Sequence, residues 1–103
     1  MSLPTERRLY VGLTRADGDL IRSALTHATR KRTAERADLH SATVTLDDID
    51  AGLSPVLGNV LILERVLRTA APEAADALRA AWTAHPSNAE TARIVAEGEA
   101  EGT

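Results

Sequence analysis

The sequence predicts an all-α protein, a small bundle of four to six helices around one central apolar helix. Three observations support this prediction. Residues 54–71 carry the most continuous apolar run in the chain. Apolar residues of the flanking segments recur with the three- and four-residue spacing of a helix face. Prolines and potential capping residues separate these segments, as is typical of helix boundaries.

The composition indicates one domain with a thin core. The chain has 103 residues and contains no Phe, one Trp and one Tyr, so Ala, Leu, Val and Ile have to form the core. A domain of this size buries about two-thirds of its unfolded surface, and small side chains contribute little apolar area. We therefore expect a second copy or a partner protein to complete the burial. We expect one helical domain at residues 1–96 and a frayed acidic tail at 97–103.

The charges are unevenly distributed along the chain. The net charge is −3, but residues 1–40 carry eight basic and five acidic side chains, whereas residues 41–103 carry four and ten. The absence of Cys excludes disulfides, Cys-ligated zinc and thiol chemistry. Residues 1–8 contain no apolar stretch typical of a secretory signal. We therefore expect a cytoplasmic protein that does not associate with membranes.

The first forty residues contain a short segment and a long helix. Residues 6–13 fit a short helix or an edge strand, and we favour the helix. An Asp-Gly pair within residues 15–19 predicts a turn, so the next helix begins near Asp19. Beyond Ala28, charged residues rotate onto the apolar face of this helix, which cannot bury them unpaired. The helix either stops near residues 29–33 or projects into solvent to about residue 39, and its high helix propensity favours the projection.

Residues 41–44 are predicted to end that helix. Thr45, with Asp48 three residues later, is typical of a capping box that begins a short helix ending at Gly52. The sequence of residues 43–49, after a basic helix, resembles the loop and last helix of archaeal-type histones. The preceding helix is shorter than in that family, and the chain continues far beyond the match.

The central helix is bracketed by helix-start and helix-stop residues. Ser54 and Pro55 suit the first positions of a helix, and Pro72 forces the residue before it out of the α region. A buried strand at residues 60–63 is the competing interpretation, because short apolar runs fit both structures. The helix is apolar around most of its circumference and has to be covered on several sides. Its flanks provide the expected protein interface, which consists of Leu57, Leu61, Ile62 and Val66.

Two helices follow the central one. Pro72 opens the first, which ends near His85, and its outer face includes Arg79. Residues 87–90 form a second potential capping box before a last helix with a weak apolar stripe. The offsets of Ala74, Leu78, Ala81 and Pro86 resemble the end of a tetratricopeptide repeat. No second copy is present, and such repeats need neighbours to bury their faces, so we interpret the match as a generic helical hairpin.

One basic segment stands out among the candidate functional residues. It contains Arg30, Lys31, Arg32 and Arg36, with Arg7 and Arg8 as potential neighbours and Glu35 and Asp38 as potential neutralising groups. Clustered guanidinium groups bind phosphates, and a basic helix can enter a nucleic-acid groove. The alternatives are a solvated helix face and a surface that docks onto an acidic partner.

The sequence shows no catalytic or cofactor signature. His40 with Asp47, Asp48 and Asp50 lacks the spacing of a metal site, and helix capping explains the carboxylates. We therefore assign no catalytic residue, metal or cofactor and identify no small-molecule substrate. We expect a non-enzymatic accessory or regulatory protein that acts through helix-mediated protein contacts, as a homodimer. A nucleic-acid-binding regulator that uses the basic segment is the alternative, and a non-catalytic subunit of an enzyme complex is the third.

Overall fold

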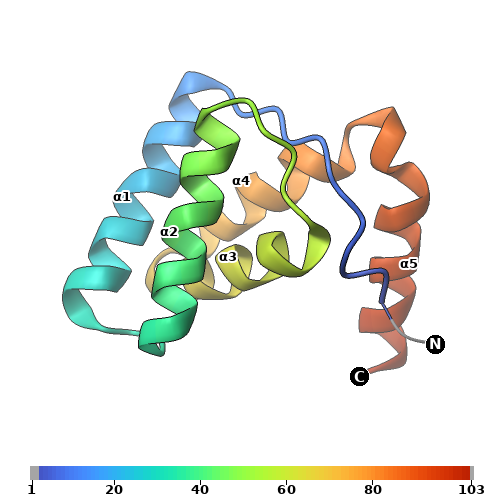
Figure 1. Ribbon diagram of the computed structural model, residues 1–103. Helices are drawn as coiled ribbons and strands as arrows, with labels where there is room; N and C mark the ends of the chain where they lie inside the picture. Colours follow the sequence, from blue (N-terminus) through green and yellow to red (C-terminus); the bar gives the residue numbers. More distant parts are fainter. Residues whose placement is uncertain (1–2, 103) are drawn as a thin grey trace.

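The computed structural model describes residues 3–102, and these residues form a helical bundle (Figure 1). No strand is present in this range apart from one isolated antiparallel bridge between Arg8 and Val56. The predicted all-α class is confirmed. The helices are α1 (Arg15–Lys31), α2 (Arg36–Asp50), α3 (Leu57–Ala70), α4 (Pro72–Thr83), a 3-10 turn η1 (Pro86–Asn88) and α5 (Ala89–Glu101).

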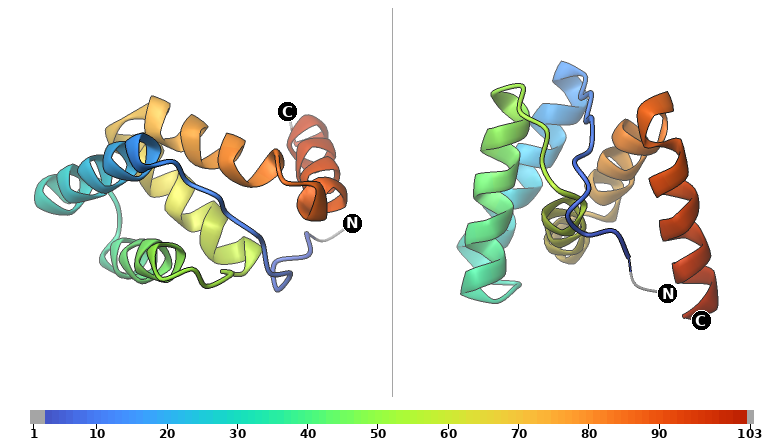
Figure 2. Two further views of the ribbon diagram at one scale, coloured as in Figure 1. Left: turned by 90° about the horizontal axis from the view of Figure 1, so that it is seen from above. Right: turned by 45° about the vertical axis from the view of Figure 1, so that its right-hand side comes forward.

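Helix α3 occupies the centre of the bundle. It packs against α1, α2 and α4, while α1 and α2 run antiparallel to each other (Figure 1). The core is therefore built around its inner residues, among which Leu57, Val60 and Leu63 are 0 % exposed. Helix α5 stands to one side, and the N-terminal segment runs between it and the α1–α2 pair (Figure 2). The apolar central helix is thus covered mainly by other parts of the same chain.

The N-terminal segment is extended, so the helix expected at residues 6–13 is wrong. Its carbonyl groups cap the start of α3: Leu57 N donates to Arg7 O (2.8 Å) and Gly58 N donates to Thr5 O (2.8 Å). The first amides of a helix lack partners within the helix, and these long-range bonds replace the side-chain cap expected from Ser54. A Cβ at position 58 would lie 3.3 Å from Thr5 O, so glycine permits this close approach.

Helix α1 begins earlier and ends sooner than expected. The Thr14 hydroxyl accepts a hydrogen bond from Asp17 N (3.1 Å), so the predicted turn at 15–19 is already helical. The helix ends at Lys31 because Arg32 adopts a left-handed conformation (φ 52°) and its amide bonds to Ala28 O. The projecting helix is therefore wrong, and the early stop weighed against it is correct. Continuing the helix would have brought charged side chains onto the buried face.

Helix α2 passes without interruption through residues 41–44, where a break was predicted. Thr45 is buried within this helix, and its hydroxyl donates to Ser41 O (2.8 Å) rather than capping a new helix. The buried positions Leu39, Ala42, Leu46 and Ile49 follow helical spacing. Their packing outweighs the local capping signal. Residues 43–49 contain no loop, so the part of the histone resemblance that placed a loop here is wrong.

The predicted boundaries of α3 and α4 hold closely. Helix α3 begins at Leu57, three residues after the expected start, and ends at Ala70. Helix α4 begins at Pro72, as predicted. No strand forms at residues 60–63. Helices α3 and α4 pack against each other as a helical hairpin, and Trp82 of α4 is 0 % exposed in the core.

Helix α5 is joined to the bundle through Asn88. The capping box predicted at residues 87–90 does not form, and the residue that precedes the helix is Asn88, whose side chain makes no cap hydrogen bond. Its side-chain amide nitrogen donates to Tyr10 O and Trp82 O (2.7 Å each), and its side-chain oxygen accepts from Tyr10 N (3.2 Å). The buried residues of α5 are Thr91 and Val95, and the helix continues to Glu101, past the domain boundary expected at residue 96. None of the helices in residues 3–102 combines the length and apolar character needed to span a membrane.

Candidate functional site

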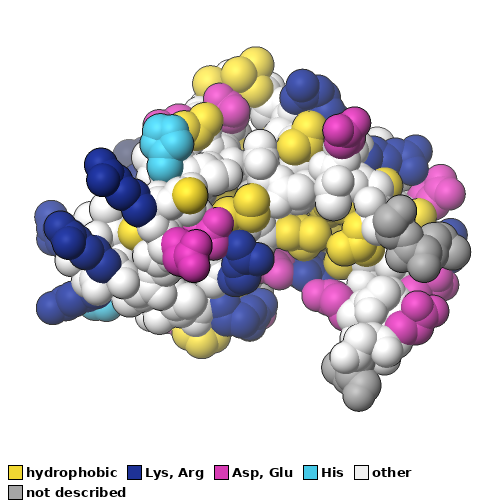
Figure 3. All heavy atoms as spheres, turned by 60° about the horizontal axis from the view of Figure 1, so that its bottom comes forward, with side chains coloured by type: hydrophobic (Ala, Val, Ile, Leu, Met, Phe, Trp, Pro, Cys, Tyr) yellow, Lys and Arg dark blue, Asp and Glu magenta, His cyan; other side chains and the backbone are white. Residues whose placement is uncertain are grey.

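The predicted basic residues meet at the connection between α1 and α2. Arg30 and Lys31 belong to the last turn of α1, Arg32 ends that helix, and Arg36 begins α2. We call these four residues the basic end. All four are exposed, and dark-blue side chains gather over the α1–α2 side of the molecule in Figure 3. The structure therefore places the sequence-predicted cations on one surface.

The basic end makes no ion pair within residues 3–102. Asp38, expected to neutralise it, instead accepts a hydrogen bond from Arg65 of α3 (2.7 Å). Arg7 and Arg8, expected as neighbours, lie elsewhere: Arg7 is 3.9 Å from Glu90, and Arg8 donates to Ser54 O (2.8 Å). Of the other basic side chains in this range, only Arg15 lacks a hydrogen bond or ion pair. Those with one are Arg7, Arg8, Arg22, Arg65, Arg68, Arg79 and Arg93.

Local helix structure does not account for every residue of the basic end. Arg30 and Lys31 lie where the negative end of the α1 dipole favours cations. Arg36 lies at the positive end of α2, where a cation is disfavoured. Arg32 has a positive φ, which costs a non-glycine residue about 1 kcal/mol or more. Arg36 therefore carries a cation where the helix dipole does not favour one, and Arg32 carries a side chain where the backbone favours glycine.

Two hollows flank the basic end. One, of about 560 Å³, lies between α1 and α2 and borders their connection, and the other, of about 600 Å³, lies along the outer face of α1. The first, which we call the interhelix hollow, is lined by Thr29, Arg32, Ala34, Arg36, Leu39, His40 and Thr43. The second is lined by Arg22, Ser23, Thr26, His27, Arg30 and Lys31. The basic end is thus divided between two hollows.

The expected protein interface does not form a single exposed face. Leu57 is 0 % exposed and Val66 is 1 % exposed, because both belong to the chain's own core. Leu61 and Ile62 are partly buried and pack against that core. Only these last two residues remain available for contact with another molecule.

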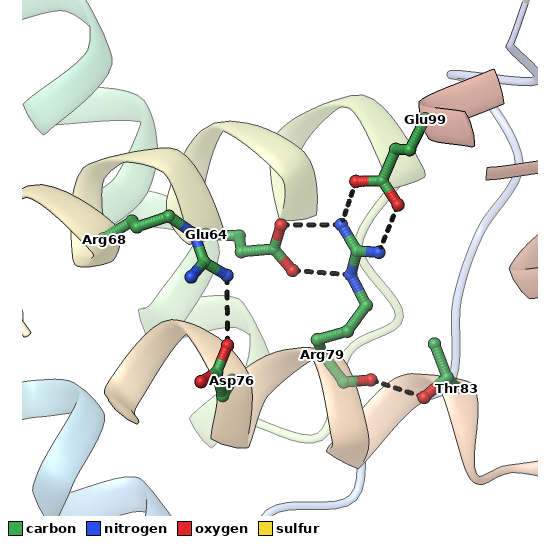
Figure 4. Close-up of polar contacts among 6 residues, drawn as sticks. All are labelled: Glu64, Arg68, Asp76, Arg79, Thr83 and Glu99. Carbon is green, nitrogen blue, oxygen red and sulfur yellow. Dashed lines mark hydrogen bonds and ion pairs between the residues drawn. The ribbon is translucent and has the colours of Figure 1, made fainter. Parts of the chain in front are cut away.

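A second charged cluster, absent from the sequence predictions, joins three helices. Arg79 of α4 donates to both carboxylate oxygens of Glu64 on α3 (2.7 Å each) and to Glu99 on α5 (2.8 and 2.9 Å), as Figure 4 shows. We call these three residues the Arg79 junction. Its hydrogen bonds, first those to Glu99 and then those to Glu64, raise the pKa of Arg79. The Arg79 guanidinium in turn lowers the pKa of Glu99.

The geometry of the Arg79 junction indicates a structural role. Both carboxylates are bound by the same guanidinium, so neither is available as a general acid or base. The sequence predicted Arg79 on the outer face of its helix, whereas its side chain is 26 % exposed and joins three helices. The neighbouring Arg68 contacts Asp76 (3.2 Å). The one sequence signal for this cluster is a charged Glu64 on a helix that is expected to be covered on several sides, because a buried charge has to be paired. Glu64 is 8 % exposed in the structure.

One histidine, His85, and two of the clustered carboxylates have structural partners. Asp47 and Asp50 bind Arg22, and no group of three or more His, Asp or Glu residues in the described part of the chain is arranged to hold a metal ion. The Ser87 hydroxyl lies 2.7 Å from His85 Nδ1, and the His85 ring stacks on Tyr10 at 4.4 Å. Across residues 3–102, no carboxylate bonds to the His85 ring. The Ser87–His85 contact therefore lacks the third, orienting group of a catalytic triad.

Comparison with protein-family models, with curated proteins and with solved structures found no match.

Proposed function

We propose that this chain is a non-enzymatic protein that binds nucleic acid through its basic end. The observation that supports the proposal is that four exposed cations gather at one connection and form no ion pair with any residue in the described range 3–102. Arginine and lysine side chains bind backbone phosphates and supply most of the sequence-independent affinity of such proteins. The four cations offer this chemistry without first having to break an internal contact.

The composition of this surface favours a phosphate polymer over a protein partner. The centre of a protein interface is typically apolar and rich in aromatic residues. The outer face of α1 next to the basic end instead carries Ser23, Thr26 and His27. Hydroxyl-bearing side chains commonly accompany Arg and Lys at phosphate contacts. The large apolar side chains that are exposed elsewhere, such as Tyr10 and Leu53, are not among the residues lining either hollow.

The uneven charge distribution supports a defined binding orientation. The net charge of −3 repels a polyanion from most of the surface. The basic end lies at the α1–α2 connection, whereas acidic α5 stands on the opposite side of the bundle (Figure 2). An approaching nucleic acid is therefore steered toward the α1–α2 connection.

Fluorescence anisotropy with a labelled 20-base-pair DNA duplex tests this proposal. If three or four phosphates are contacted, log K should fall with log salt at a slope of about −3 to −4. Replacing all four basic-end residues with Ala should abolish binding. The double variant Arg15→Ala/Arg93→Ala removes two cations elsewhere and should retain most of the affinity. Absence of wild-type binding at low salt would refute the proposal, as would an equal loss in the control and in Arg32→Ala/Arg36→Ala.

Self-association is a second candidate function. Its support is the partial exposure of Leu61 and Ile62 on the central helix. Two partly exposed side chains offer a small apolar contact, so we rank this function below nucleic-acid binding. Light scattering at micromolar concentration tests it. A dimer that Leu61→Asp/Ile62→Asp converts to a monomer would support it, and a monomeric wild type would contradict it.

A further inference from the structure

The interhelix hollow has a shape that the backbone itself creates. It lies between two antiparallel helices and is bordered by the turn that connects them. Leu39, which is 9 % exposed, contributes an apolar side chain to its lining. The hollow on the outer face of α1 has a different origin, because its lining comes from one helix only. Side chains of a single helix therefore define the outer hollow, whereas two helices define the interhelix hollow.

Three cationic or hydrogen-bond-donating side chains line the interhelix hollow. Arg36 and His40 are four residues apart on α2 and therefore share a face. Arg32 faces them from the end of α1, where the left-handed backbone (φ 52°) turns the chain toward α2. The N-terminus of α2 lies beside them and has no side-chain cap, so the helix dipole adds to the positive potential.

The threonine hydroxyls in the lining of this hollow already donate to backbone carbonyls, and no lining carboxylate competes with an anion for the remaining donors. The hydroxyls of Thr29 and Thr43 donate to Leu25 O and Leu39 O, each at 2.9 Å. No carboxylate lines the hollow, and Asp38 in the first turn of α2 bonds to Arg65. The donors that remain for a ligand come from Arg32, Arg36 and His40, and all three suit an anion.

We propose that the interhelix hollow binds a phosphate group, held by Arg32 and Arg36 with His40 as a third donor. This inference rests on the proposed function and deepens it, because it makes the hollow the anchor for one backbone phosphate. Arginine pairs bind phosphate with bidentate, charge-assisted hydrogen bonds. Arg30 and Lys31 lie outside the hollow and add only long-range attraction. The basic end therefore divides into two anchoring residues and two steering residues.

A nuclear magnetic resonance titration with inorganic phosphate tests the site directly, and a parallel titration with the DNA duplex tests the polymer as the source of the phosphate. We expect phosphate to shift the backbone amide signals of residues 29–43 more than those of residues 22–28. Arg36→Gln should weaken phosphate and duplex binding at least tenfold, and His40→Ala should weaken both by a smaller factor. Lys31→Gln removes the same charge from outside the hollow and should change phosphate binding by less than twofold.

The outcomes separate this inference from the proposed function. If Arg36→Gln and Lys31→Gln weaken duplex binding equally, the phosphate site in the hollow is refuted, while the proposed nucleic-acid function stands. Phosphate binding in the hollow without duplex binding supports the site and refutes the nucleic-acid function. Absence of both refutes both. Circular dichroism of each variant verifies that the fold is intact, and Arg36→Lys, which keeps the charge without the bidentate geometry, should recover only part of the affinity.

Discussion

The Arg79 junction and the basic end use the same chemical group in opposite ways. Within residues 3–102, the side-chain hydrogen bonds of Arg79 all go to two carboxylates, those of Glu64 and Glu99 (Figure 4). The guanidinium groups of Arg32 and Arg36 have no partner among residues 3–102, and both are exposed and line the interhelix hollow. An arginine whose donors are satisfied within the fold serves the fold, and one whose donors are free is available for a ligand.

Burial explains why the two groups differ in their importance for stability. The Glu64 side chain is 10 % exposed and the Arg79 side chain 26 %, whereas all residues of the basic end are exposed. A charge removed from water needs its partner, because desolvation of the unpaired charge is costly. An exposed charge keeps its hydration. We therefore expect substitutions at the junction to affect folding and those at the basic end to affect binding.

The largest effect is expected for Arg79→Ala. This substitution leaves Glu64 buried without a partner and should lower the free energy of unfolding by about 3 kcal/mol. Urea denaturation followed by circular dichroism measures the change. Glu99 is exposed, so Glu99→Ala should cost less than about 1 kcal/mol. A cost for Arg79→Ala as small as that of Arg15→Ala would contradict the structural role of the junction.

Acid should weaken the Arg79 junction. The pKa of Glu99 in the folded protein is lowered from its ordinary value near 4.5 by Arg79. A carboxyl group with a depressed folded pKa contributes stability above its unfolded pKa and loses it as the pH falls through the folded pKa. The midpoint of urea unfolding should therefore decline as the pH falls below about 4.5, and less so in Glu99→Gln. If Glu99→Gln loses stability as steeply as the wild type when the pH falls, the assignment of this loss to Glu99 is contradicted.

Arg32→Gly should raise stability while lowering affinity. Glycine relieves the cost of the positive φ at this position, although it also increases the entropy of the unfolded chain. We expect a net gain of about 0.5 kcal/mol in urea denaturation and weaker phosphate binding. Arg30→Gly introduces the same residue within helix α1 and should instead lose about 0.5–1 kcal/mol. Equal stability changes in the two variants would show that the backbone of Arg32 is not strained.

The smallest effect on stability is expected for the combined Ala substitution of the basic end. No ion pair is lost, so the free energy of unfolding should change by no more than about 0.5 kcal/mol. The same variant should lose binding to duplex DNA. A large loss of stability would show that the basic end, like the Arg79 junction, stabilises the fold.

The sequence predicted the helices most accurately where local signals had no competitor. Pro72 separates α3 from α4 because proline constrains the residue before it, and the outcome does not depend on distant contacts. The N-terminal segment was predicted wrongly because its partners are the amides of Leu57 and Gly58, about fifty residues away in the chain. Thr45 was predicted as a cap, but tertiary packing placed it inside α2.

The sequence by itself determined the all-α class, the central apolar helix and the concentration of cations at residues 30–36. These properties depend on local periodicity and composition. Only the tertiary structure decided which charges are paired, because Glu64, Arg79 and Glu99 come from three different helices. It also decided that Asp38 binds Arg65 and forms no ion pair with the basic end. Pairing depends on distances in space between residues far apart in the chain, and no local pattern in the sequence encodes those distances.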